Sequence, residues 1–148
     1  MKARNNNLIK IAQKALSKNK EIWKNEEKGE ILESYDGQIA ALGVTIASSG
    51  LLPALAIYFA DHKDNKDKKS KGTKAYKRNV LEVIAIMISE DKKDYFDNKT
   101  GKSLSEKLLK KALVSNIDDL KALSKEIIEC AVALKFIVRT YNLVKDEK

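Results

Sequence analysis

Apolar residues recur every three or four positions along most of the chain, which is the spacing of amphipathic α-helices. This periodicity predicts six helices, over residues 6–23, 30–48, 51–61, 74–91, from 103 onward, and 117–144. Asparagines at 5–7 offer an N-cap for the first helix, and Ser103 followed by Glu106 resembles a capping box for the fifth. We therefore expect an all-α fold, a compact bundle of about six helices forming a single domain over residues 1–148.

The middle of the chain contains a long uncharged segment. No charged residue lies between Asp36 and Asp61, and residues 39–60 are enough to span a bilayer as one helix. However, Gly50 and Pro53 predict that one helix ends and another begins there, and each half is then too short to span. We expect a central broken apolar helix pair, buried in the bundle. The alternative is a small membrane protein anchored by residues 39–60.

Composition supports the helical prediction. The chain has 148 residues, 43% of them apolar, with 6 Gly and 1 Pro. A β-sandwich or barrel needs many more turn residues, and one domain is the natural organisation at this length. No long apolar core follows the N-terminal residues, so we expect no secretory signal and a cytoplasmic protein.

Positive charge is both abundant and clustered. Lys and Arg number 29 against 21 Asp and Glu, giving a formal net charge of +8 and a pI near 9.4. Only Arg4, Arg78 and Arg139 are arginine, and a lysine-dominated surface acts as a diffuse field for a polyanion. Residues 62–73 contain no apolar side chain, so we expect a mobile basic loop that leads into the fourth helix.

The lysine clusters are the candidate binding residues. Sequence-independent contact with a phosphate backbone needs only cations held along a loop or helix face. The main candidates for binding a polyanion are Lys66, Lys68, Lys69, Lys71, Lys74, Lys77 and Arg78. Weaker candidates, paired four residues apart on helices, are Lys14, Lys18, Lys135 and Arg139.

Catalytic and metal-binding patterns are not convincing. His62 is the only histidine and Cys130 the only cysteine, so a multi-ligand zinc site or a Cys–His pair has little support. Gly101-Lys102-Ser103 ends like a phosphate-binding loop, but Phe96 stands where the first glycine is required. We expect Cys130 to be a small buried residue, no cofactor and no metal, and a protein that is not an enzyme.

The sequence around the central break resembles a known family. The residues that carry the resemblance are Tyr35, Ile46, Ser49-Gly50-Leu51 and Ala54-Leu55-Ala56-Ile57-Tyr58-Phe59, with Glu129, Leu134-Lys135-Phe136 and Arg139 near the C-terminus. This pattern is similar to the small all-helical subunit of type III-B (Cmr) CRISPR RNA-guided effector complexes. An analogous subunit exists in type III-A complexes, so the subtype stays open at this point.

The resemblance implies a non-catalytic role in antiviral defence. Such subunits stack as several copies in a short filament along the guide–target duplex, beside other subunits, and offer positive charge to guide and target RNA. A protein in this role has no membrane partner. Two alternatives stay open: the membrane protein anchored by residues 39–60, and a helical homo-oligomer or regulator with no nucleic-acid role, whose charge serves solubility alone.

Overall fold

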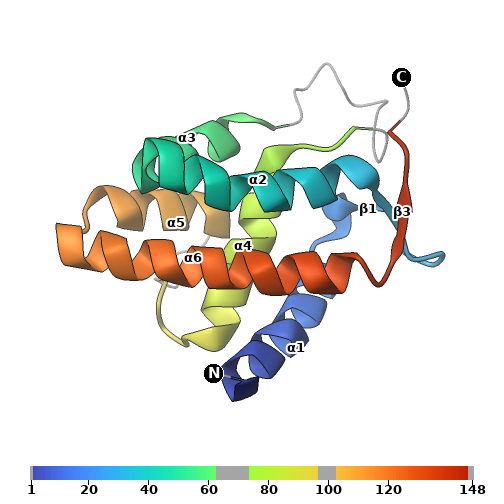
Figure 1. Cartoon of the computed structure of the whole chain (residues 1–148), viewed down its shortest axis with the longest axis horizontal. Coiled ribbons are helices and arrows are strands. Elements are labelled where there is room, and N and C mark those ends of the chain that lie inside the picture. Colours follow the sequence, from blue (N-terminus) through green and yellow to red (C-terminus); the bar gives the residue numbers. More distant parts are fainter. Residues whose placement is uncertain (1, 63–73, 97–102, 147–148) are drawn as a thin grey trace.

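The computed structural model describes residues 2–62, 74–96 and 103–146, and these ranges form a six-helix bundle (Figure 1). The helices are α1 (Lys2–Lys18), α2 (Glu33–Ser49), α3 (Leu51–Ala60), α4 (Lys77–Asp91), α5 (Leu104–Leu113) and α6 (Ile117–Val138). The all-α prediction is confirmed. The predicted mobile loop lies outside the described residues, except for His62. Among the described residues, no helix is long and apolar enough to cross a membrane.

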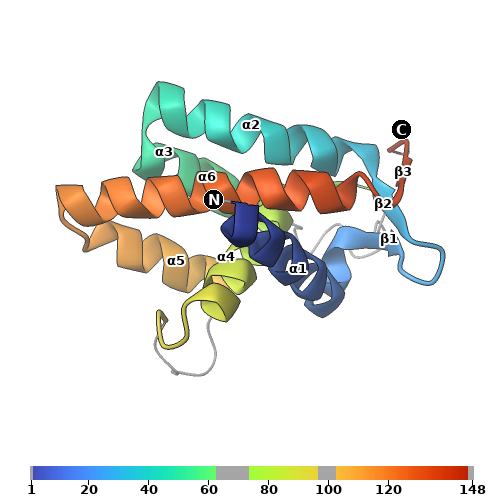
Figure 2. The same cartoon turned by 60° about the horizontal axis from the view of Figure 1, so that its bottom comes forward.

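The centre of the bundle is α4, around which the other helices pack (Figure 2). Its buried residues cover more than one face of the helix: Val80, Leu81, Val83, Ile84, Ala85, Met87 and Ile88. The expectation that the broken helix pair occupies the centre is wrong. On α2 only one face is buried, and the other exposes small or apolar uncharged side chains such as Ala41 and Val44.

The predicted break between α2 and α3 is confirmed. Gly50 has a φ of 92° and a ψ of 165°, a backbone conformation that side chains other than glycine rarely adopt. Its N–H donates to the Ile46 carbonyl at 2.9 Å, and its carbonyl accepts from the Ala54 N–H at 3.2 Å. Pro53 lies in the first turn of α3, where its missing N–H costs no hydrogen bond.

A small three-stranded sheet was not predicted from the sequence. Its strands are β1 (Trp23–Asn25), β2 (Glu30–Leu32) and β3 (Asn142–Val144), in the order β1-β2-β3. The first pair is antiparallel and the second parallel, with Ile31 opposite Leu143. The predicted first and sixth helices therefore end too late and the predicted second helix begins too early, because these end segments form strands instead.

Side-chain contacts explain where α1 stops. The Asn19 side chain accepts from the Glu21 N–H at 3.0 Å and starts a separate 3-10 turn, Lys20–Ile22. The Trp23 indole then folds back, donating to the Leu16 carbonyl at 2.9 Å, and its ring meets Tyr141 edge-on with centroids 4.9 Å apart. This contact brings the C-terminal strand against the N-terminal third of the chain.

The predicted helix starts agree with the structure for α3, α5 and α6 and differ for α1, α2 and α4. The Ser103 hydroxyl accepts from the Glu106 N–H at 3.3 Å, as the predicted capping box requires. By contrast, α1 already begins at Lys2, so the asparagines at 5–7 lie within the helix and cap nothing. The fourth helix begins at Lys77 instead of residue 74.

Gly50→Ala tests the break directly. A Cβ at this position would meet only Pro53 Cδ, at 3.8 Å, so the penalty comes from the backbone conformation alone. We expect the free energy of unfolding to fall by about 1–3 kcal/mol in urea titrations.

The matched control is Gly43→Ala inside α2, where a Cβ meets nothing within 4 Å. Better helix propensity there should raise stability by about 0.5–1 kcal/mol. Equal effects of the two changes would contradict the account.

Candidate nucleic-acid interface

The predicted RNA-binding residues fall into a part that the structure describes and a part that it does not. Lys66, Lys68, Lys69 and Lys71 lie outside the described residues. The others belong to three separate places on the bundle, namely the start of α4, the α1–α4 contact, and the end of α6. The structure therefore does not bring the described candidates together into one surface.

Lys74 and Lys77 lie where the chain enters α4. The Lys74 ammonium is 5.5 Å from the Tyr76 ring centroid and that of Lys77 is 5.7 Å from the Tyr58 ring centroid. Neither ammonium has a carboxylate partner among the described residues. The backbone is well fixed here, because Lys77 N–H donates to the Asp61 carboxylate at 2.9 Å. Lys77 therefore lies at a fixed helix start, and Lys74 lies in the segment that precedes it.

Arg78 has a different environment from its two neighbours. Its guanidinium lies 3.9 Å above the Phe59 ring centroid and its Nε–H donates to the Phe59 carbonyl. Burial lowers the pKa of this guanidinium, although Glu106 and Glu82 oppose the shift. Arg78 thus ties the start of α4 to the end of α3, where the last carbonyls of α3 need donors.

Lys14 and Lys18 share one carboxylate. The Lys14 ammonium is 3.0 Å from a Glu90 oxygen, and the Lys18 ammonium contacts the other oxygen. Hydrogen bonds from Lys18 and Lys14 lower the pKa of Glu90. The row of lysines predicted on α1 therefore joins α1 to α4 and is partly neutralised.

The C-terminal pair is also partly engaged. Arg139 donates to both oxygens of Asp36, at 3.0 and 3.4 Å, and so links the end of α6 to α2. Lys135 is half-buried one turn earlier. The helical spacing that places these two cations together was correct, but the sequence did not indicate the carboxylate that lies opposite.

An ion cluster around Arg4 was missed by sequence reasoning. The guanidinium contacts Asp91 at 3.3 Å, Glu126 at 3.1 Å and Glu129 at 3.1 Å, and Lys92 approaches Glu126 at 3.3 Å. Burial raises the pKa of Glu126, as does its hydrogen bond with Asp91, while Lys92 and Arg4 lower it. The cluster joins α1, α4 and α6. Arg4 is 87 residues from Asp91 and 122 residues from Glu126 in the sequence, so no local pattern could show the contact.

A basic cleft beside α5 was also missed. It lies between α5 and the segment after α4, and its lining includes Tyr95, Phe96, Lys107, Lys110 and Lys111. The lysines occur at i, i+3 and i+4, so a search for cationic residues on one helix face would have found them. The leucines on the opposite side of α5 predict only a helix that packs against the core, and the lysine face was not considered as a binding site.

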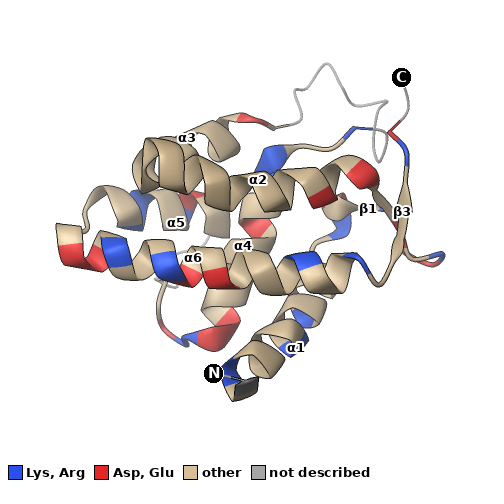
Figure 3. Ribbon diagram, viewed as in Figure 1, with Lys and Arg blue, Asp and Glu red and all other residues tan. Residues whose placement is uncertain are grey.

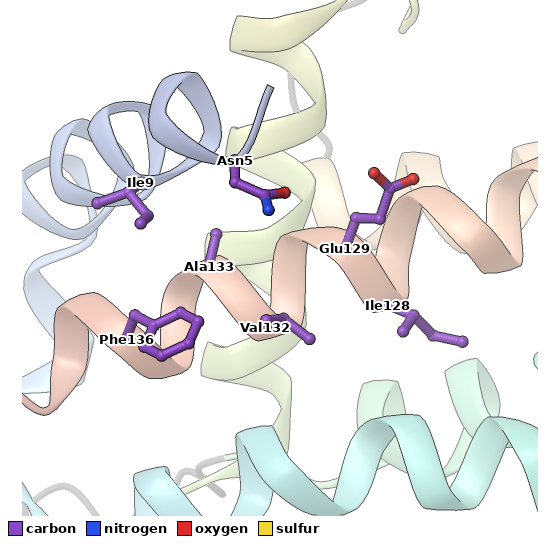
Figure 4. Close-up of a pocket in the computed structure, with 7 residues that line it drawn as sticks. All are labelled: Asn5, Ile9, Ile128, Glu129, Val132, Ala133 and Phe136. Carbon is purple, nitrogen blue, oxygen red and sulfur yellow. The ribbon is translucent and has the colours of Figure 1, made fainter. Parts of the chain in front are cut away.

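An apolar groove runs between α1 and α6 (Figure 4). Ile128, Val132 and Phe136 follow one another along α6 and are 36%, 51% and 61% exposed, while Ile9 faces them from α1. The enclosed volume is about 180 Å³. Figure 3 shows that α2 and α3 are also almost free of charge along most of their length. These side chains leave apolar surface that the described residues do not cover.

The candidate nucleophile Cys130 lies in the core. Cys130 is fully buried in α6, as predicted, and burial raises the pKa of its thiol to about 12. Within the described ranges, no group of three or more His, Cys, Asp or Glu side chains could hold a metal ion.

These surfaces define a small, basic, helical protein that presents cationic and apolar faces on a rigid bundle. The family model described as CRISPR-associated protein (Cas_Cmr5) matches residues 9–141, which is most of the chain. The chain therefore belongs to the Cas_Cmr5 family, and the resemblance to the small subunit of type III-B Cmr complexes is confirmed. Comparisons with curated proteins and with solved structures give no match.

Glu90→Gln tests the α1–α4 ion pairs. Since the pKa of Glu90 is lowered by folding, its carboxylate stabilises the protein above the ordinary carboxyl pKa, and this contribution is lost as the pH falls through the lowered value. We expect the variant to lose about 0.5–1 kcal/mol of unfolding free energy at pH 7 and almost nothing in strong acid. Urea titrations at both pH values check this, with Glu27→Gln as the exposed control. A loss that is independent of pH would contradict the assignment.

Proposed function

We propose that the chain is a non-catalytic, cytoplasmic subunit of a type III-B RNA-guided complex. In this role it stacks with copies of itself along the guide–target duplex, contacts the other subunits, and offers positive charge to the RNA. The observation that carries the proposal is the family match over residues 9–141. The exposed apolar groove supports it, as do the lysines at the start of α4, which have no carboxylate partner among the described residues. A subunit of this kind needs a protein-binding face and a polyanion-binding face.

The stacking contact is proposed between two different surfaces of neighbouring copies. One is the α1–α6 groove around Val132. The other is the corner between α5 and α6, where Leu113, Val114 and Ile117 are 60%, 86% and 71% exposed. The corner lies at one end of the bundle, at the left of Figure 1, and the groove lies along its flank. When copies join groove to corner, one groove stays free at one end of the assembly and one corner stays free at the other. Further copies can therefore add at both ends to form a filament.

Charge also favours this pairing. Exposed Asp118 and Asp119 directly follow Ile117 at the corner. On the groove side, exposed Lys125 and half-buried Lys135 flank the apolar side chains of α6. Opposite charges around two apolar patches favour the correct orientation and speed the encounter more than they add affinity.

RNA contact is proposed for the lysines at the start of α4 and in the segment before it. These are Lys66, Lys68, Lys69, Lys71, Lys74 and Lys77, with Arg78 fixing the helix start. Lys14, Lys18, Lys135 and Arg139 remain secondary candidates, since an RNA phosphate at three of them must compete with Glu90 or Asp36. The contact is expected to be independent of sequence, because lysine ammonium groups act as point charges.

A tagged pull-down tests membership in the complex and stacking together. Reconstituted or native complexes containing this chain should carry a guide RNA, larger subunits and several copies of the chain, counted by native mass spectrometry. We expect Val132→Glu, which disrupts the groove, and Ile117→Glu, which disrupts the corner, each to reduce the number to one copy. The control Ala60→Glu adds the same charge at an exposed site outside both surfaces and should change nothing.

Mixing the two variants gives the sharper result. The Val132→Glu chain keeps an intact corner and the Ile117→Glu chain keeps an intact groove, so together they can form one contact. We expect two copies per complex in the mixture. Several copies in either single-variant complex would contradict stacking through these surfaces, and a pull-down without guide RNA or larger subunits would contradict membership.

Lys74→Gln combined with Lys77→Gln tests the RNA-contact proposal. Each phosphate contact with a single strand contributes about 0.7 to the slope of log affinity against log salt, so the slope should fall by about 1.4 with little change in sequence preference. The measurement is RNA affinity of the assembled complex over a salt series. The control Lys28→Gln with Lys145→Gln removes the same charge from exposed positions elsewhere. An unchanged slope would leave these lysines as solvated surface and favour the homo-oligomer without an RNA role.

A further inference from the structure

The basic cleft beside α5 has the size and chemistry of a nucleotide site. Its volume is about 540 Å³, within the range of about 300–1,000 Å³ that is typical of small-molecule sites. Lysines from α5 form one wall and Tyr95 and Phe96, which follow α4, form another. A single region of the surface therefore offers cations and aromatic rings side by side.

The lysines of this cleft differ from the other cations of the bundle. Lys107, Lys110 and Lys111 lie on one face of α5, and like charges at such spacings are destabilising. Lys110 is exposed and has no carboxylate partner among the described residues, whereas Lys14 and Lys18 share Glu90. The helix dipole favours Lys110 and Lys111 in the last turn, but it does not account for the aromatic rings opposite. An anion bound in the cleft would offset the charge of Lys110.

The aromatic wall is held in place. The Lys111 ammonium lies 3.8 Å from the Tyr95 ring centroid and donates to the Tyr95 carbonyl at 2.5 Å. Phe96 meets the same ring edge-on, with centroids 5.1 Å apart. Burial raises the pKa of the Tyr95 hydroxyl above its ordinary value, which already lies well above neutral pH. Tyr95 is only half-buried, and it therefore presents both a ring and a donor to the cleft.

We propose that this cleft binds the backbone of an RNA strand, with Lys107, Lys110 and Lys111 against phosphate oxygens and the Tyr95 ring against a base. Basic grooves that also carry aromatic side chains are the usual means of holding single-stranded nucleic acid without reading its sequence. An acidic protein segment would use the lysines but would gain little from the ring. The inference rests on the proposed role as a subunit that contacts RNA, and it assigns that contact to a second place, away from the start of α4.

The first test uses the full chain and a fluorescently labelled single-stranded RNA of mixed sequence. The variant is Lys107→Gln, Lys110→Gln and Lys111→Gln combined, and the control combines Lys10→Gln, Lys121→Gln and Lys145→Gln, which are exposed positions outside the cleft. Both variants remove three charges. We expect at least a tenfold loss of affinity at low salt and a fall of about 2 in the salt slope for the cleft variant, and less than a threefold loss for the control. Equal losses, or no RNA binding by the unmodified chain at low salt, would overturn the proposal.

The second test separates RNA from other polyanions. Tyr95→Leu should weaken RNA binding about tenfold while Tyr95→Phe, which keeps the ring, should bind nearly as well as the unmodified chain. Equal effects of the two substitutions would overturn the role of the ring. A poly-glutamate peptide that binds more tightly than RNA and depends on the same lysines would assign the cleft to an acidic protein partner instead.

The third test distinguishes failure of this site from failure of the proposed function. The cleft variant is reconstituted with the larger subunits and guide RNA, and ultraviolet cross-linking to target RNA is followed by mass spectrometry. We expect the complex to assemble, with cross-links at Tyr95 in the unmodified chain and their loss in the variant. Assembly with unchanged cross-links would overturn the cleft alone, whereas failure of the unmodified chain to assemble would overturn the proposed function.

Discussion

The burial of α4 is the constraint on which the rest of the structure depends. Five helices surround it, and its apolar residues occupy more than one face. Each neighbouring helix therefore needs only one apolar face of its own to pack against the core. The outer faces of α2, α3, α5 and α6 are therefore free to differ in character without weakening the core. Removing water from such residues supplies about 25 cal/mol per Å² of apolar surface, which makes the centre of the bundle its main source of stability.

The outer faces divide into two kinds. The part of α2 after Asp36 is uncharged and exposes side chains such as Val44, and α6 exposes Val132 and Phe136, whereas α5 and the start of α4 carry lysines. Ion pairs at Glu90 and Asp36 occupy other cations and join helices within the bundle. For a family member of an RNA-guided complex, this division suits a body that binds protein on one side and polyanion on another.

Much of this arrangement could be predicted from the sequence, where the signal was local. The helical period, the Ser103 cap and the Gly50 break are each visible within a few residues, and all three are confirmed. The sheet was missed because β2 pairs with β3 from the other end of the chain, and three-residue strands leave no periodic pattern. The Glu90 partner of Lys14 and Lys18 was missed for the same reason, since a sequence does not show which carboxylate packs opposite a helix face.

The central claim is that the function lies in surfaces that bind partners, and an electron cryo-microscopy reconstruction of the intact effector complex tests it most directly. The account predicts that the α1–α6 groove of one copy covers the α5–α6 corner of the next, and that the lysines of α5 and the start of α4 face RNA. A reconstruction in which Val132 and Phe136 face solvent while Lys110 and Lys74 lie far from any phosphate would contradict it.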